Sequence, residues 1–166
     1  MLEKHFHAGN PDGPGAEHVM RMKDEQLRAL VENTPDAITR WDSNFRLVFA
    51  NNAFAEKSGT PVNEALGKTS VQMGHPPEVS HAFVEKLRKV FETQQPQEHY
   101  NYYPSPEGNL YFHSRMVPEF AVDGTVTTVL NIARDITHTH NIKIELEEVN
   151  RRCCIRRACR KRWWRS

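Results

Sequence analysis

Residues 37–59, AITRWDSNFRLVFANNAFAEKSG, carry the order of signals that decides the fold. Two short apolar runs flank the turn-forming triplet Asp42-Ser-Asn44, and this pattern predicts a β-hairpin. Asn51 and Asn52 follow at the place where a helix N-cap belongs, and Gly59 ends the helix that they begin. A hairpin that leads directly into a helix indicates a protein of mixed strands and helices.

A second, longer helix begins at Pro76-Pro77, after a short helical turn over residues 61–66. At 100° per residue, its large apolar side chains fall within a stripe of about 140°. These side chains are Val79, Phe83, Val84, Leu87, Val90 and Phe91. We therefore expect this helix to pack one face on a core.

Three strands are predicted after this helix, over residues 98–103, 110–118 and 125–136. Pro106–Asn109 forms the first turn, and Asp123-Gly124 is a two-residue hairpin signal. Alternation predicts that one face of the second strand carries Leu110, Phe112, Ser114 and Met116. It predicts that one face of the third carries Val126, Thr128, Leu130 and Ile132. The order ββ-ααα-βββ indicates an α+β protein with an antiparallel sheet.

Helical periodicity flanks this folded segment on both sides, over residues 17–33 and 138–153. The second helix carries a short heptad-like seam of Ile142, Leu146, Val149 and Cys153. We accordingly divide the chain into five parts. They are an N-terminal stub and linker (1–16), a flanking helix (17–33), the main domain (34–137), a second helix (138–153) and a basic tail (154–166).

The net charge of +1 over 166 residues conceals a division within the chain. Residues 151–166 hold eight basic residues and no acidic one, which leaves 14 basic and 21 acidic residues in the rest. All three cysteines, Cys153, Cys154 and Cys159, also lie in this tail, so no disulfide can support the domain. No apolar run approaches the roughly 20 residues of a membrane span, and we expect a cytoplasmic protein.

Several motifs in this order resemble a PAS domain over residues 24–137. They are LRALVENTPDAITRWDSNFRLVFANNAFAEKSG (27–59), VFETQQPQ (90–97) and PEGNLYFHSRMVPEFAVDGTVTTVLNIARDIT (106–137). The resemblance implies a five-stranded antiparallel sheet with helices over one face. It also implies dimerisation through the flanking helices and relay of a signal through Asp135, Ile136 and Thr137 into the helix that follows. Such domains occur mostly in bacterial sensor histidine kinases of two-component systems and in cyclic-dinucleotide enzymes.

A small ligand would bind between the sheet and the helices, where a PAS domain senses molecules, light or redox state. We expect the lining to comprise Ile38, Phe54, Phe83, Val84, Leu87, Tyr100, Tyr102, Phe112, Met116, Leu130 and Ile132. Tyr100, Tyr102 and Ser80 are the polar groups that would orient the ligand. The alternative is a plain packed core without a cavity, because a core needs the same residues.

The sequence favours no cofactor. Haem would need a histidine on the long helix, but His81 lies outside the apolar stripe and His75 precedes the helix, which indicates a solvated and a loop histidine. Cysteine-dependent flavin photochemistry is excluded for a domain without cysteine, whereas non-covalent flavin binding stays open. The pairs His5-X-His7 and His138-X-His140 each offer too few ligands for a metal site.

The leading interpretation is a sensory and dimerisation module that lacks catalytic activity and relays its signal to an output domain or response regulator. No nucleophile elbow, phosphate loop, metalloprotease motif or zinc quartet occurs in the sequence. A second interpretation is an enzyme or carrier with a similar α+β fold around an apolar pocket. Its interior would need a titratable group, and the predicted inner face offers only tyrosines.

The basic tail supports a third interpretation, a binder of nucleic acid or acidic membrane, although the acidic domain argues against nucleic acid. Trp163 and Trp164 stand among its arginines and would stack on bases or insert into lipid. The tail is alternatively a plain charged end. We favour a change of reading frame near codon 150, because the helical seam stops abruptly in a Cys- and Arg-dense stretch and the output domain is then missing.

Overall fold

The computed structural model describes residues 14–105 and 108–163 of the chain. The His5-X-His7 pair, most of the predicted stub, the Pro106–Glu107 turn residues and the last three residues of the tail lie outside these ranges. The side chains of the tail from Cys153 onward also lie outside the described part.

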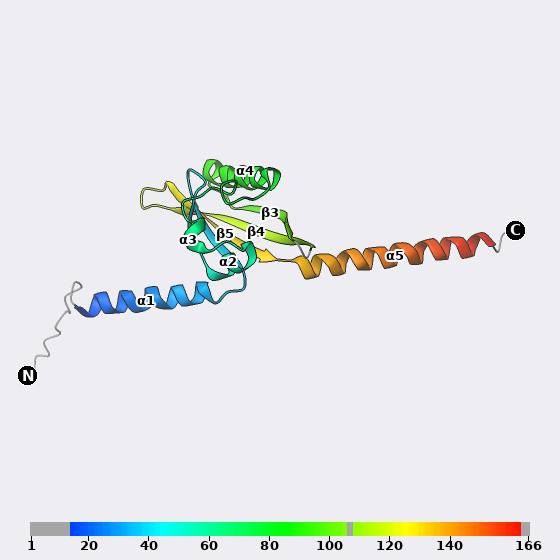
Figure 1. The fold of residues 1–166 in the computed structure, drawn as a ribbon, viewed down its shortest axis with the longest axis horizontal. Helices are drawn as coiled ribbons and strands as arrows, with labels where there is room; N and C mark the ends of the chain where they lie inside the picture. Colours follow the sequence, from blue (N-terminus) through cyan, green and yellow to red (C-terminus); the bar gives the residue numbers. More distant parts are fainter. Residues whose placement is uncertain (1–13, 106–107, 164–166) are drawn as a thin grey trace, which may run out of the picture.

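Ten helices and strands are described, in the order that the sequence predicts. They are α1 (Pro14–Glu32), β1 (Ala37–Asp42), β2 (Leu47–Ala50), α2 (Asn52–Ser58), α3 (Val62–Ala65), α4 (Pro77–Thr93), β3 (Gln97–Ser105), β4 (Gly108–Phe120), β5 (Val126–Asp135) and α5 (Thr137–Trp163). Helix α5 continues to Trp163, ten residues beyond the end expected at Cys153. Figure 1 shows α1 and α5 projecting as long helices from the body formed by the sheet and α2–α4.

The strands form one five-stranded antiparallel sheet in the order β2-β1-β5-β4-β3. The first hairpin therefore pairs with the last strand of the domain, and β1 and β5 are neighbours in the middle of the sheet. Helix α4 crosses over β3 and β4, and α2 lies beside β1 (Figure 1). The α+β class and the five-stranded antiparallel sheet predicted from the sequence are confirmed.

Local chemistry explains where α2 begins and ends. The Asn51 side chain accepts a hydrogen bond from the Phe54 amide and so caps the N-terminus of the helix. Gly59 ends it in the left-handed region at φ 68°, which glycine adopts without the strain of a Cβ. Both boundaries agree with the sequence prediction.

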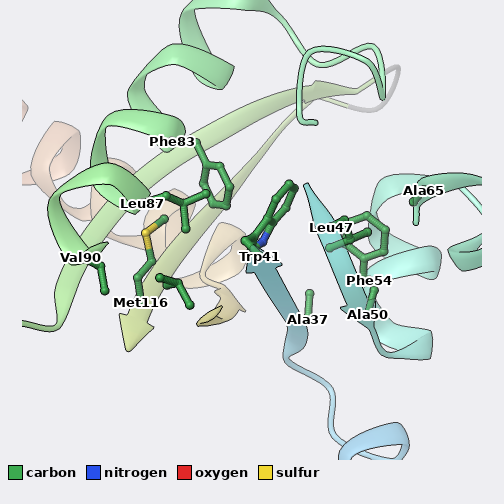
Figure 2. Packing of buried hydrophobic residues seen from close by; sticks show 11 residues of the cluster. Ala37, Trp41, Leu47, Ala50, Phe54, Ala65, Phe83, Leu87, Val90 and Met116 are labelled. Atoms are coloured by element: carbon green, nitrogen blue, oxygen red, sulfur yellow. The ribbon is translucent and has the colours of Figure 1, made fainter. Parts of the chain in front are cut away.

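The packed core lies between the sheet and the helices, with the Trp41 indole at its centre (Figure 2). In Figure 2, Trp41 stands between a group on the α4 side, which includes Phe83 and Leu87, and a group on the α2 side, which includes Leu47 and Phe54. The Trp41 and Phe83 rings meet edge to face at a centroid distance of 5.1 Å. Phe83, Leu87 and the other buried residues of α4 fall on the predicted stripe, so the helix buries one face as expected.

The predicted faces of β5 are wrong beyond its first residues. Val126 packs against the core as expected, but the buried residues that follow are Val129 and Asn131 rather than Leu130 and Ile132. The pairing with β4 shifts between Glu119 and Phe120, so no residue of β4 lies opposite Thr127 in the strand register. Such a bulge displaces the alternation by one residue, so every later side chain changes face.

No helix in the described ranges is long and apolar enough to cross a membrane. Helices α1 and α5 nevertheless expose several large apolar side chains. They are Met22, Leu27 and Leu30 on α1, and Ile142, Ile144, Leu146 and Val149 on α5.

Candidate functional site

A cavity of about 590 Å³ lies between the inner face of the sheet and the helical layer. All strands except β2 contribute to its wall, together with α2, α4 and the loop over residues 70–76. A volume of this size suits a small organic molecule. The domain therefore contains both a packed core and a cavity beside it, rather than a core that fills the whole interior.

Aromatic rings form much of the cavity wall. Trp41 from β1, Phe54 from α2 and Phe83 from α4 supply three of them. Tyr103 and Phe112, from the neighbouring strands β3 and β4, meet edge to face with ring centroids 5.7 Å apart. Rings fixed in this way offer flat apolar surfaces to a bound molecule.

The polar part of the wall comes from the sheet. Asn131 donates from Nδ2 to Thr39 Oγ1 at 3.2 Å, and the Trp41 indole N–H donates to the same oxygen at 2.9 Å. The Oδ1 atoms of Asn131 and Asn101 are buried and have no hydrogen-bond partner among the described residues. Buried acceptors are nearly always paired in folded proteins, so each of these two oxygens carries an uncompensated cost of desolvation.

A second polar cluster closes the end of the cavity near α4. Ser70 Oγ lies 3.0 Å from His75 Nδ1 and 3.0 Å from Ser80 Oγ. Burial lowers the pKa of His75, which keeps the imidazole neutral at pH 7. Burial also raises the pKa of Tyr103 to about 12, against a smaller lowering effect of the nearby Asn101 side chain.

Lys57 connects the cavity with the start of α5. It lies in the cavity wall, and its Nζ is 3.2 Å from Asp135 Oδ2. The other oxygen of Asp135 accepts a hydrogen bond from the Thr137 amide at 3.0 Å, where α5 begins. Partial burial raises the pKa of Asp135, but the hydrogen bonds from Thr137 and the ammonium of Lys57 outweigh it and lower that pKa overall.

The structure brings three of the eleven predicted lining residues to the cavity, namely Phe54, Phe83 and Phe112. Leu87 and Met116 belong to the packed core beside the cavity, and Val84 is half-buried on α4 outside the cavity wall. Ser80, expected to orient a ligand, is buried and bonded to Ser70 instead.

The remaining five predicted lining residues lie outside the cavity wall: Ile38, Tyr100, Tyr102, Leu130 and Ile132. Tyr100 is 65% exposed and Tyr102 is 49% exposed, because the inner positions of β3 belong to His99, Asn101 and Tyr103. Ile38 pairs with Ile132 across the central strands, and both lie on the face opposite the cavity.

The sequence prediction missed the polar residues of the wall. Thr39, Asn101 and Asn131 each stand next to more hydrophobic residues in their strands, and the sequence pattern predicts those neighbours to face the interior. The expectation that the interior offers only tyrosines as titratable groups is also wrong. His75 lines the cavity, and His99 is buried on the inner face of β3.

The histidines that the sequence offers as possible haem or metal ligands lie at separate places in the structure. His81 is exposed on α4 and His75 precedes that helix, as predicted. His140 stacks on the Tyr111 ring at a centroid distance of 3.8 Å, and His138 is exposed. Among the residues that the structure describes, no three His, Cys, Asp or Glu side chains gather where they could hold a metal ion.

Comparison with known proteins identifies one matching family model, described as the PAS fold, over residues 31–141. No curated protein matches the chain. Two solved structures of Vibrio cholerae VqmA are similar to this chain. In a VqmA–ligand–DNA complex it is 24% identical, with 68% of this chain and 50% of that chain covered and a TM-score of 0.61. In a VqmA dimer without target DNA it is 24% identical, with 69% and 52% covered and a TM-score of 0.62.

The PAS domain of BvgS from Bordetella pertussis is also similar in structure. It is 20% identical, with 78% of this chain and 98% of that domain covered and a TM-score of 0.60. Identities at this level show a shared fold. The chain spans about half the length of the VqmA chains that it matches.

Half-buried His75 and buried His99 predict a pH dependence of stability. Burial lowers the pKa of His75, and burial and the nearby charge of Lys86 lower that of His99, from the ordinary 6.5. Below pH 6.5 the unfolded chain then binds more protons than the folded one. The contribution of the two neutral imidazoles to the free energy of unfolding is therefore complete above pH 6.5, and it is lost as the pH falls toward the lowered pKa values of the folded state.

We expect the free energy of urea unfolding to decrease between about pH 7 and pH 5, and to decrease less in His75→Gln. His81→Gln, at an exposed position on α4, is the matched control and should retain the wild-type slope. Equal slopes in wild type and His75→Gln would contradict the burial of a neutral imidazole.

Proposed function

The chain belongs to the PAS-fold family, and we propose that it is a sensory module whose ligand occupies the cavity and whose output begins at helix α5. The observation that carries this proposal is the position of Lys57. Its side chain forms part of the cavity wall and also holds Asp135, the residue that accepts the hydrogen bond from the first amide of α5.

This arrangement provides a short path from ligand to helix. A molecule that contacts Lys57, or that displaces the Phe112 ring beneath its ammonium, changes the geometry of the Lys57–Asp135 pair. Thr137 Oγ1 also accepts a hydrogen bond from the Tyr111 amide, so the start of α5 is fixed to β4 as well. Asp135, Ile136 and Thr137 thus form the proposed relay, and the ligand acts by preferring one of two states of it.

Helix α5 is the proposed route to an output domain and, with α1, the proposed surface for a second copy of the chain. Leu30 of α1 is 71% exposed and Leu146 of α5 is 58% exposed. Apolar side chains in a row along a helix are usually covered by a partner. The class of the output, a histidine kinase or a cyclic-dinucleotide enzyme, rests on the family resemblance alone.

A cavity-filling variant tests ligand binding. We expect N-phenyl-1-naphthylamine, a neutral fluorescent probe, to bind the wild-type protein saturably, because the cavity is large and aromatic. Ala133→Phe places a ring inside the wall and should weaken probe binding at least tenfold, with an unchanged circular-dichroism spectrum. The control, Ala82→Phe on the exposed side of α4, should bind as wild type. Absence of saturable binding to the wild type would refute the ligand site.

Hydrogen exchange tests the relay. Lys57→Met removes the ion pair with Asp135, and we expect the amides of Thr137–His140 to exchange about twofold to fivefold faster, which is the range of a partly exposed ion pair. Lys89→Met, exposed on α4, removes the same charge elsewhere and should leave these rates unchanged. Equal rates in all three proteins would show that Lys57 does not hold the start of α5.

Sedimentation equilibrium tests self-association. Leu146→Glu places a charge on the apolar seam of α5, and we expect the dissociation constant of the dimer to rise at least tenfold. Asn141→Glu adds the same charge on α5 away from the seam and should have little effect. A wild-type protein that remains monomeric, or a dimer insensitive to Leu146→Glu, would rule out pairing through α5.

A further inference from the structure

Four residues of the cavity wall are exposed to solvent, and they mark where the cavity meets the surface. Glu56 and Gly59 belong to the end of α2 and its C-cap, Gly74 to the loop before α4, and Pro104 to the end of β3. The other wall residues are buried or half-buried. The mouth of the cavity therefore lies between the end of α2, this loop and the end of β3.

The imidazole of His75 lies at this mouth. His75 follows the exposed Gly74 in the loop, and Tyr103 precedes the exposed Pro104 on β3. The rings of His75 and Tyr103 are in contact, with centroids 5.0 Å apart and planes inclined by 55°. Tyr103 is fixed on the sheet by its edge-to-face contact with Phe112. The half-buried imidazole thus bridges the loop and the sheet at the place where the cavity opens.

Within the described part of the chain, one side-chain hydrogen bond holds the imidazole in this position. It joins His75 Nδ1 to Ser70 Oγ, and Ser70 is 2% exposed and bonded in turn to the fully buried Ser80. The backbone of His75 is fixed separately, because its amide donates to the Ser70 carbonyl and its carbonyl accepts from Ser80 Oγ, each at 3.4 Å. The side chain can therefore leave the mouth by rotation, at the loss of one hydrogen bond and one ring contact.

The surroundings of His75 favour its neutral form. The charged and titratable groups on the elements around it are Tyr103 of β3, Glu78 and His81 of α4, and Glu56 and Lys57 of α2. Burial alone lowers the pKa of His75, so none of these groups compensates a charge on the closed imidazole. Helix α4 begins two residues later, and the positive end of its dipole also disfavours a cation at this place.

We propose that the imidazole of His75 is a proton-operated gate of the cavity: the neutral ring closes the mouth, and the protonated ring rotates into solvent and opens it. Protonation favours the open state because the charge is hydrated there and buried in the closed state. Acidification then speeds both the entry and the exit of a ligand. This inference rests on the proposed function, because it takes the cavity as the ligand site.

Stopped-flow fluorescence with N-phenyl-1-naphthylamine tests the gate, because this probe is uncharged and its own binding groups do not titrate in the range used. The full-length protein is mixed with the probe at pH 7.5 and at pH 5.5, and circular dichroism verifies the fold at both values. We expect the entry rate constant of the wild type to rise at least about twofold at the lower pH. A residue that only lines the wall would alter the exit rate, whereas a gate alters entry and exit together.

Two variants separate the proton from the hydrogen bond. His75→Phe retains a ring beside Tyr103 but cannot be protonated, so its entry rate should be the same at both pH values. Ser70→Ala removes the hydroxyl that holds the imidazole, and it should raise the entry rate at pH 7.5 about threefold to tenfold, which is the range for one hydrogen bond. His81→Phe, at an exposed histidine of α4, is the matched control and should retain the wild-type rates and their pH dependence.

Two results would overturn the inference. They are a wild-type entry rate that does not change with pH, and an acid response in His75→Phe as large as that of the wild type. In both cases saturable probe binding that Ala133→Phe weakens would leave the proposed function intact. A wild-type protein that does not bind the probe at all would instead remove the proposed function, and the gate with it.

Discussion

The domain depends on the hydrogen bonds that the side-chain amide of Asn51 forms. The side chain is completely buried, and Oδ1 accepts from the amides of Ile38 and Phe54 while Nδ2 donates to the carbonyls of Val31 and Asp36. One side chain thus joins the end of α1, the start of β1 and the start of α2. Because each hydrogen-bonding position of this buried amide is used, a shorter or apolar residue would leave several backbone groups unpaired.

This junction also determines where the cavity lies. It holds β1 against α2, and both elements contribute to the cavity wall through Thr39, Trp41 and Phe54. Trp41 serves the packed core and the cavity at once: its ring packs against Phe83, and its indole N–H fixes Thr39 and so the Asn131 amide. The cavity is therefore not a defect of packing, since the polar groups around it are oriented by the same residues that fill the core.

The fold was predictable from the sequence because its signals are local. The turn at Asp42, the caps at Asn51 and Gly59 and the stripe on α4 each depend on a few neighbouring residues. The site was less predictable. Alternation assigns the more hydrophobic face of a strand to the interior and therefore places Tyr100 and Tyr102 inside, whereas the wall of this cavity is partly polar and includes Asn101. On β5 the inner face is predicted wrongly for another reason: a bulge at Thr127 shifts the alternation, and no residue pattern in the strand predicts this bulge.

The same geometry underlies the route that we propose from the cavity to helix α5. Lys57 and Asp135 are 78 residues apart in the chain, yet their charged groups are in contact because α2 lies beside the end of β5. Asp135 directs one oxygen to the Lys57 ammonium and the other to the Thr137 amide, so a shift of its carboxylate affects both partners together. No chain of intermediate residues is needed, since the wall of the cavity and the cap of α5 meet at one carboxylate. In a helix that otherwise makes few contacts with the domain, its first turn is where such a shift has most effect.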